Sequence, residues 1–183
     1  MIHTNIFKLQ DDETIVAKQG YHWIVYVGII ANGIFLVLLP IVLFLVAERF
    51  DFLMPTPITL HFILLAYTVW VLALWTATLA QLTVTALNQW VITDRRIVSI
   101  DQSGFFNTLI ASWQYNNIVE VSAEKSGVLQ TFLNYGHIEI QTAGMADDYE
   151  QMDNVSDPEY VRSLILEQID AYTVRRDELR SSS

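Results

Sequence analysis

Two apolar stretches decide how this chain is organised. Residues 23–46 have the sequence WIVYVGIIANGIFLVLLPIVLFLV, and residues 58–85 have the sequence ITLHFILLAYTVWVLALWTATLAQLTVT. Neither stretch contains an Asp, Glu, Lys or Arg residue. An uncharged apolar run of about 18 or more residues is typical of a membrane-crossing helix, because about 20 residues at a rise of 1.5 Å span the hydrocarbon core. We therefore expect two transmembrane helices, over about 23–46 and 58–85.

The charges that flank the two spans predict their orientation. The connector between the spans is short and ends in prolines, so we expect a helical hairpin with both termini on one side. Lys8 and Lys18 precede the first span and Arg95 and Arg96 follow the second, whereas the connector carries only Arg49. Because positive residues beside the spans mark the cytoplasmic side, we expect both termini in the cytoplasm.

Small side chains within the spans predict where the two helices pack. Small residues allow helix backbones to approach closely, which stabilises helix pairs in lipid. Candidate packing residues share a face in the cytoplasmic half of each span, and they are Gly28, Ala31, Asn32, Ala73, Ala77 and Ala80. We expect Asn32 to make an interhelical hydrogen bond. The absence of charged residues in both spans argues against a transporter that acts alone.

Composition excludes several classes of function. The chain has no cysteine, which excludes disulfides, thiolate metal sites and cysteine nucleophiles. Its net charge of −10 argues against binding to nucleic acid. The four histidines are scattered, and no phosphate-binding, dinucleotide-binding or nucleophile-elbow motif is present. We therefore expect no metal, no cofactor and no catalytic residues.

The second half of the chain has the period of β-strands. Apolar and polar residues alternate, for example through Val119–Ala123 and Ile138–Thr142, and turn-forming residues separate the strands. An apolar stripe at helical spacing then runs from Val161 to Tyr172. We expect an α+β membrane protein: a two-helix transmembrane hairpin, then an antiparallel β-barrel or sandwich capped by a C-terminal amphipathic helix. A pleckstrin-homology-like (PH-like) antiparallel β-barrel or sandwich has this architecture, and other small barrels and α+β sandwiches share the same pattern.

Several short blocks resemble the bacterial PH-like, YdbS-like family of membrane proteins. The blocks are His22-Trp23, Trp90–Val98, Gly127–Gly136, Gln141–Gly144 and Asp157–Val161, and they occur in the order of that family. The resemblance implies a membrane-tethered PH-like domain in the bacterial inner (plasma) membrane. It implies a fold rather than a reaction, because the family supplies no catalytic residues.

These observations predict four segments. They are an N-terminal cytoplasmic segment at 1–21, the transmembrane hairpin at 22–87, a PH-like cytoplasmic domain at 88–175 and a polar tail at 176–183.

Two groups of residues in the domain are candidate contacts. Arg95 and Arg96 lie close to the second span and are candidates for a lipid headgroup; the alternative is that they set topology and pair with Asp94 or Asp101. Apolar residues in two predicted connections are candidates for a membrane or partner contact, the alternative being that they fold back onto the barrel, and they are Phe105, Phe106, Leu129, Phe132 and Leu133.

The leading hypothesis is a non-enzymatic interaction or assembly module at the cytoplasmic face of the membrane. Its expected partners are membrane lipids and a second copy of the chain or other membrane proteins. Two alternatives remain: a module that binds anionic lipid, and an accessory subunit of a transporter or membrane enzyme.

Overall fold

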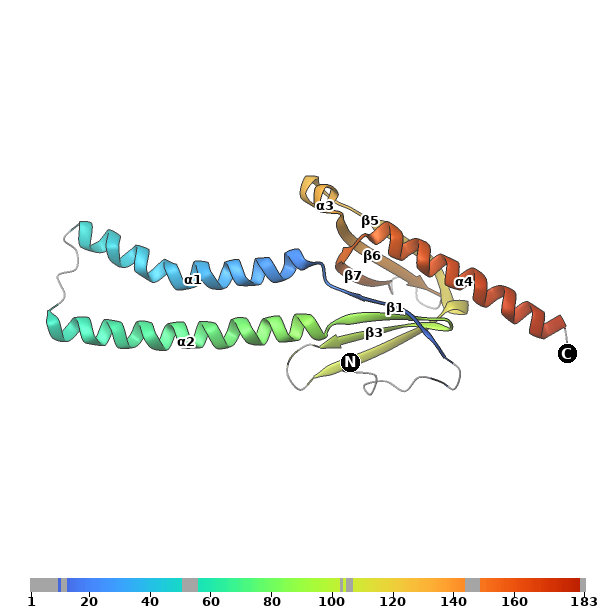
Figure 1. The fold of residues 1–183 in the computed structure, drawn as a ribbon, viewed down its shortest axis with the longest axis horizontal. Helices are drawn as coiled ribbons and strands as arrows, with labels where there is room; N and C mark the ends of the chain where they lie inside the picture. The colour runs from blue at the N-terminus through green and yellow to red at the C-terminus, as the bar shows by residue number, and fades with distance from the viewer. Residues whose placement is uncertain are drawn as a thin grey trace. The chain divides into compact units, whose positions relative to one another are not determined.

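The computed structural model describes residue 10 and residues 13–50, 56–102, 104, 107–143 and 149–181 of the 183-residue chain. Two compact units make up the structure. One contains residues 23–85, and the other contains the segments before and after them, residues 1–22 and 86–183. Figure 1 shows the first unit as a pair of helices and the second as strands and a long helix.

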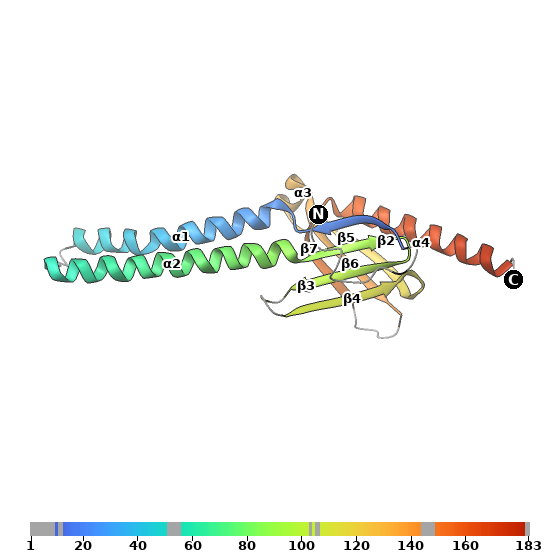
Figure 2. The same cartoon turned by 60° about the horizontal axis from the view of Figure 1, so that its bottom comes forward.

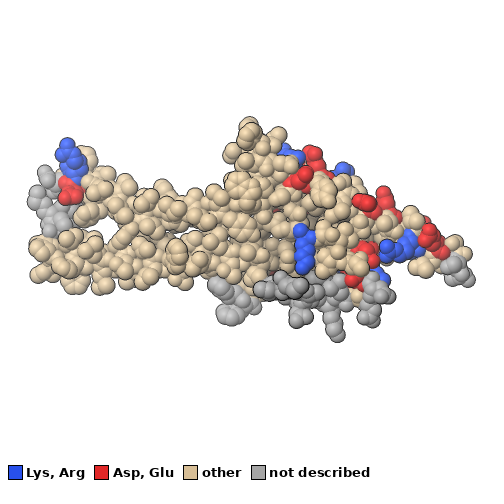
Figure 3. All heavy atoms as spheres, in the orientation of Figure 1, with Lys and Arg blue, Asp and Glu red and all other residues tan. Residues whose placement is uncertain are grey.

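The helical unit is an antiparallel pair formed by α1 (Trp23–Arg49) and α2 (Pro57–Leu87). Both helices are long and apolar enough to cross a membrane. In α1 only Ile29 is buried, and in α2 only Thr85, so the apolar side chains of the pair are exposed or half-buried. The face drawn in Figure 3 carries charged side chains along these helices only at the end of α1.

The second unit begins with a four-stranded antiparallel sheet. Its strands lie in chain order and are β1 (Ile15–Gly20), β2 (Gln89–Thr93), β3 (Arg96–Gln102) and β4 (Thr108–Gln114). Gly20 at the end of β1 pairs with Gln89 at the start of β2. The whole helical unit is therefore inserted between two neighbouring strands, where a hairpin would have its turn (Figure 2).

A three-stranded antiparallel sheet and a helix complete this unit. The sheet contains β5 (Ile118–Glu124), β6 (Tyr135–Thr142) and β7 (Tyr149–Ser156), and the short helix α3 (Val128–Leu133) connects β5 to β6. A 3-10 turn, Tyr115–Asn117, precedes β5. The C-terminal helix α4 (Pro158–Ser181) is capped by the preceding Asp157, whose carboxylate accepts a hydrogen bond from the amide of Tyr160.

One hydrophobic core joins both sheets to α4. Its side chains come from inward-facing strand positions and from the buried stripe of the helix, and they are Trp90, Ile92, Ile97, Tyr115, Val121, Ile138, Ile140, Met152, Val155, Val161 and Ile165. Alternate positions on β2 and β3 form a second small cluster, Val91, Val98 and Ile100. The period of two therefore places apolar side chains on both faces of this sheet.

The alternating pattern correctly predicted the antiparallel sheets, and the apolar stripe at helical spacing correctly predicted the C-terminal helix. Two segment boundaries differ from the sequence analysis. Residues 15–20 are a strand of the first sheet and not part of a separate N-terminal segment. The C-terminal helix continues to Ser181 and does not end at residue 175.

Candidate functional site

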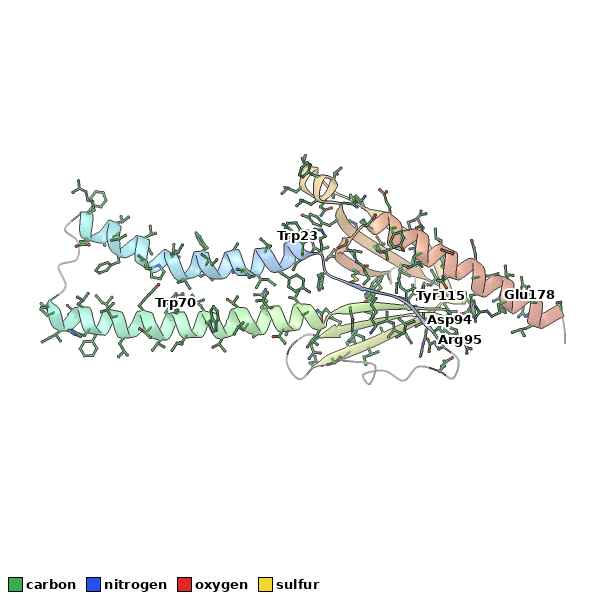
Figure 4. The ribbon with its side chains drawn as sticks, in the orientation of Figure 1. Trp23, Trp70, Asp94, Arg95, Tyr115 and Glu178 are labelled. Carbon is green, nitrogen blue, oxygen red and sulfur yellow. The ribbon has the colours of Figure 1, made fainter. Side chains whose placement is uncertain are left out.

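A basic pocket lies at the end of the first sheet where β2 turns into β3. Its cavity has a volume of about 330 Å³, and its lining residues are Gln10, Arg95, Arg96, Gln114, Tyr172, Arg175, Arg176 and Leu179. We call it the arginine pocket. The four residues from α4 follow the spacing of one helix face, so a single helix supplies half of the wall. Figure 4 labels Arg95 and Asp94 in the turn beside this helix.

A buried ion pair fixes one side of the arginine pocket. Arg96 donates from Nε and Nη2 to the two carboxylate oxygens of Glu13, over 2.9 and 2.8 Å. The hydroxyl of Thr93 and the amide of Gln10 also donate to this carboxylate. Burial alone would raise the pKa of Glu13, but the hydrogen bonds from Arg96, Gln10 and Thr93, with the charge of Arg96, lower it below its ordinary value.

A second ion pair connects α4 to the β2–β3 turn. Arg175 Nη1 lies 3.3 Å from Asp94 Oδ2, and the amide of Thr14 donates to the other oxygen of the same carboxylate. Tyr172 packs edge-to-face on Tyr115, whose hydroxyl donates to the carbonyl of Thr93. Burial, followed by the charges of Asp94 and Glu13, raises the pKa of Tyr115, so its hydroxyl stays protonated near neutral pH.

The sequence analysis singled out Arg95 and Arg96 but missed the rest of this pocket. Arg96 pairs with Glu13, and not with Asp94 or Asp101 as the sequence alternative had it, because β1 brings Glu13 beside the β2–β3 turn. Arg175 and Arg176 were missed because the apolar stripe of the predicted helix ends at Tyr172. The signal that could have identified them is a continued helical spacing, through Tyr172, Arg175, Arg176 and Leu179.

An exposed apolar surface lies at the other end of this unit, on α3. Val128, Leu129 and Phe132 are 86%, 68% and 85% exposed, and we call these three residues the α3 surface. Leu133 is half-buried. Of the remaining predicted contact residues, Phe105 and Phe106 lie outside the described residues.

Contacts around His22 show which end of the unit the α3 surface occupies. The ring of His22 stacks on Tyr135, the first residue after the helix and its cap, with ring centroids 5.1 Å apart. The amide of His22 also donates to the carbonyl of Asn154 on β7. Burial lowers the pKa of His22. Since His22 immediately precedes α1, the α3 surface lies at the end of the unit where the chain enters and leaves the helices.

One close approach between α1 and α2 lies at residues that the sequence analysis did not select. A Cβ atom built on Gly33 would lie 2.9 Å from Thr78 Oγ1, so these two residues mark the close approach of the helices. A Cβ atom on Gly28 would meet nothing within 4 Å. The other selected residues are half-buried or exposed, and they are Ala31, Asn32, Ala73, Ala77 and Ala80. Residue size alone does not show which small residues face the partner helix, because this depends on the rotation of each helix.

Hydrogen bonds from α2 reach the backbone of α1 near its proline. Trp70 Nε1 donates to the carbonyl of Leu36 over 3.3 Å, and the hydroxyl of Tyr67 donates to the carbonyl of Val37 over 3.2 Å. Figure 4 labels Trp70 on α2.

Within the part of the chain that the structure describes, no three His, Asp or Glu side chains gather in a way that could hold a metal ion.

Most of the sequence matches the model of a known protein family. The family model described as the bacterial PH domain matches residues 23–169. Among solved structures, the chain is similar to the crystal structure of a DUF1696 family protein with a pleckstrin-homology domain from Shewanella loihica PV-4. The identity is 18% and the TM-score 0.36, over 46% of this chain and 69% of that chain. No curated protein matches the chain.

Proposed function

Because this chain belongs to the bacterial PH domain family, we propose that it is a membrane-anchored PH domain protein. In this proposal the helical pair crosses the inner membrane, both termini are cytoplasmic, and the domain acts as a non-enzymatic interaction and assembly module at the membrane surface. The single observation that carries it is the exposure of apolar side chains around α1 and α2, for example Phe35 at 60% and Trp75 at 65%. A helix that is apolar all round is stable only where lipid or protein surrounds it.

Backbone hydrogen bonding supports a lipid environment for the helices. A carbonyl without a partner is unfavourable in hydrocarbon because no water is present. Pro40 cannot donate to the carbonyl of Leu36, and Trp70 of the neighbouring helix donates to it instead. The pair therefore satisfies, without water, a carbonyl that its own proline would leave unpaired.

Charge and chain connection support the cytoplasmic placement of the domain. Lys18 precedes α1 and Arg95 and Arg96 follow α2, which is the distribution that the positive-inside rule associates with the cytoplasm. Only Tyr21 and His22 separate β1 from α1, and only Asn88 separates α2 from β2. With α1 and α2 in the membrane, these short connections keep the domain close to its surface.

The α3 surface supports a contact between the domain and the membrane. Leu129 and Phe132 are exposed, although large apolar residues in a soluble loop usually fold against the core. The stack of Tyr135 on His22 holds α3 at the end of the domain from which α1 departs. Aromatic and aliphatic residues at that position are suited to the interfacial region of a bilayer.

Asn32 supports assembly with a second copy of the chain. Its side chain is exposed on α1, and no described residue forms a hydrogen bond with its amide group. Amide groups in lipid are stabilised by pairing across helices. A neighbouring copy of α1 would provide an identical amide.

The natural absence of cysteine allows a direct test of this topology. Glu48→Cys places a thiol at the connector end of α1, and Ser126→Cys places one on the domain beside α3. We expect a membrane-impermeant maleimide to label Glu48→Cys in intact cells and Ser126→Cys only after permeabilisation. Labelling of Ser126→Cys in intact cells would overturn the proposed orientation, and recovery of the full chain in the soluble fraction without detergent would overturn the membrane anchor.

Native mass spectrometry in detergent tests the assembly part of the proposal. We expect a dimer or higher oligomer, or a copurifying membrane protein. A strict monomer without any partner would contradict an assembly role while leaving the topology result in place.

A further inference from the structure

Four of the ten Lys and Arg residues of an acidic chain line one cavity of about 330 Å³. The four residues are Arg95, Arg96, Arg175 and Arg176. Their cluster is positive, whereas the chain as a whole has a net charge of −10. We propose that the arginine pocket is a binding site for a phosphate-bearing organic anion. This inference is independent of the assembly role proposed above.

Two of the guanidinium groups are already held in position by carboxylates. Glu13 orients Arg96 through two hydrogen bonds, and Asp94 orients Arg175 through one contact of 3.3 Å. A guanidinium carries five N–H donors, so the single contact through Nη1 leaves Arg175 with further donors. Groups that are held before a ligand arrives lose little side-chain freedom when it binds. The two ion pairs therefore hold the guanidinium groups in place for a ligand and do not use up all of their hydrogen-bond donors.

Arg176 provides a donor that lacks a partner. Its Nε is buried and forms no hydrogen bond with a described residue. The carboxylate of Asp177 lies 3.9 Å away, which is beyond hydrogen-bond distance. Buried polar groups in native proteins are nearly always paired, so an unpaired one requires an explanation. Arg176 lines the cavity with a side chain that is 42% exposed, so a ligand there could offer its guanidinium group an acceptor.

The shape and lining of the pocket favour an organic phosphate. Guanidinium groups bind phosphate oxygens through pairs of parallel hydrogen bonds, which suits a cluster of arginines better than a cluster of lysines would. The cavity lies in the volume range of small-molecule sites, roughly 300–1,000 Å³. Tyr172 and Leu179 add an aromatic and an aliphatic wall, and Gln114 adds a neutral polar group. These walls would contact the organic part of a phosphate monoester.

The phosphate could come from a soluble metabolite or from a lipid headgroup. The pocket lies at the Thr93 end of β2, whereas the chain enters and leaves the domain at the Gln89 end. At a rise of about 3.3 Å per residue, the length of β2 separates the two ends by roughly 13 Å. A headgroup in the same leaflet would reach the pocket only with the sheet lying along the membrane, and a soluble ligand needs no such orientation.

Calorimetric titration of the full chain in uncharged detergent tests the proposal, with glycerol 3-phosphate as the probe. We expect saturable binding with a dissociation constant of about 1 mM or lower. Arg175→Gln and Arg176→Gln should each weaken binding by about tenfold, because each removes a charged hydrogen-bond donor. Arg180→Gln is the matched control, since it removes the same charge from the same helix outside the pocket, and it should change binding by less than about twofold.

The outcomes separate a binding site from a structural ion-pair network. Absence of binding to the wild-type chain, or an equal loss in Arg180→Gln and Arg176→Gln, would overturn the proposal. Thermal unfolding of each variant checks its fold. If Arg176→Gln is unfolded, Arg176→Lys replaces it, and it should still weaken binding because lysine lacks the planar pair of donors.

The same titration in nanodiscs distinguishes the two sources of phosphate. One set of discs contains phosphatidylcholine only, and the other contains phosphatidic acid in addition. Loss of glycerol 3-phosphate binding only in the second set would show that a lipid phosphate fills the arginine pocket. Equal binding in both sets would assign the site to a soluble phosphate.

Discussion

The indole Nε1 of Trp70 lies 3.3 Å from the carbonyl oxygen of Leu36, the acceptor that Pro40 leaves without an intrahelical donor. A proline within a helix removes one backbone hydrogen bond and bends the helix at that point. Here the neighbouring helix supplies the missing donor, and Tyr67 supplies another to the adjacent carbonyl of Val37. The bend and the helix contact are therefore one feature of the structure.

Removal of the indole donor should destabilise the helical pair. We expect Trp70→Phe to lower the free energy of unfolding by about 1 kcal/mol, the usual scale of an interhelical hydrogen bond in lipid. Unfolding of the full chain in mixed micelles with increasing dodecyl sulfate measures it, with Trp75→Phe, an exposed tryptophan on the same helix, as the control. In a Pro40→Ala background, where residue 40 donates to Leu36 itself, Trp70→Phe should have little effect. An equal loss in both backgrounds would show that the indole acts only through packing.

Gly136 is a position where the fold requires the absence of a side chain. A Cβ atom there would overlap the Glu124 carbonyl oxygen and would lie 3.1 Å from Pro158 Cγ. Neither backbone nor proline ring can move without shifting β5 or α4, so Gly136→Ala should lower the stability of the domain by about 2 kcal/mol or more. Thermal unfolding tests this. Gly20→Ala, whose new carbon would lie 3.9 Å from the nearest atom, should lose less than half as much.

The ion pair of Glu13 with Arg96 should make the domain sensitive to acid. The pKa of Glu13 is lowered in the folded chain, so its ionised form stabilises the fold at any pH above the ordinary pKa of about 4.3. This contribution is lost as the pH falls through the lowered pKa. We expect Glu13→Gln to lower stability at neutral pH by about 2 kcal/mol, and the difference from wild type to shrink below about pH 4. The exposed Glu120→Gln is the control. A difference that is constant with pH would contradict this role of the carboxylate.

Contact of the α3 surface with lipid should be visible in fluorescence. We expect a bimane dye on Leu129→Cys to be quenched by brominated lipids, because this residue lies at the end of the domain where α1 begins. The same dye on Asn116→Cys, an exposed residue in the turn before β5 at the opposite end, should be quenched much less. Equal quenching at both positions would remove the argument that α3 is the membrane-facing element.

Local sequence patterns predicted the helices and strands of this fold better than they predicted which of them pair in the tertiary structure. The alternation around Ile138 and Ile140 identified β6 because one buried face imposes a period of two. β1 was missed because its partner β2 follows only after the inserted helices. For the arginine pocket, the sequence singled out only Arg95 and Arg96, because they lie close to the second span in the chain. Glu13, Arg175 and Arg176 come next to them only through tertiary structure. Residue type alone did not show that Gly33 faces α2 while Gly28 does not.

Asn32 should control the association of one copy of the chain with another. Its amide is exposed on α1, in a stretch where the surrounding surface is apolar. In lipid this group is stabilised by pairing with an amide of a neighbouring helix, by about 1 kcal/mol. Asn32→Leu should therefore lower the dimer fraction severalfold while leaving the fold of each copy intact. Energy transfer between labelled copies in vesicles, measured over a series of protein-to-lipid ratios, gives that fraction.

Gln81→Leu is the matched control for this effect, because it also replaces an exposed amide with leucine but lies near the end of α2, where interfacial water reaches it. If both substitutions lower the dimer fraction equally, the effect reflects general polarity and not a specific contact of Asn32. If neither does, association of the chain does not depend on Asn32. A loss confined to Asn32→Leu would place the interface between copies on the face of α1 that also carries Gly28, since residues four apart share one side of a helix.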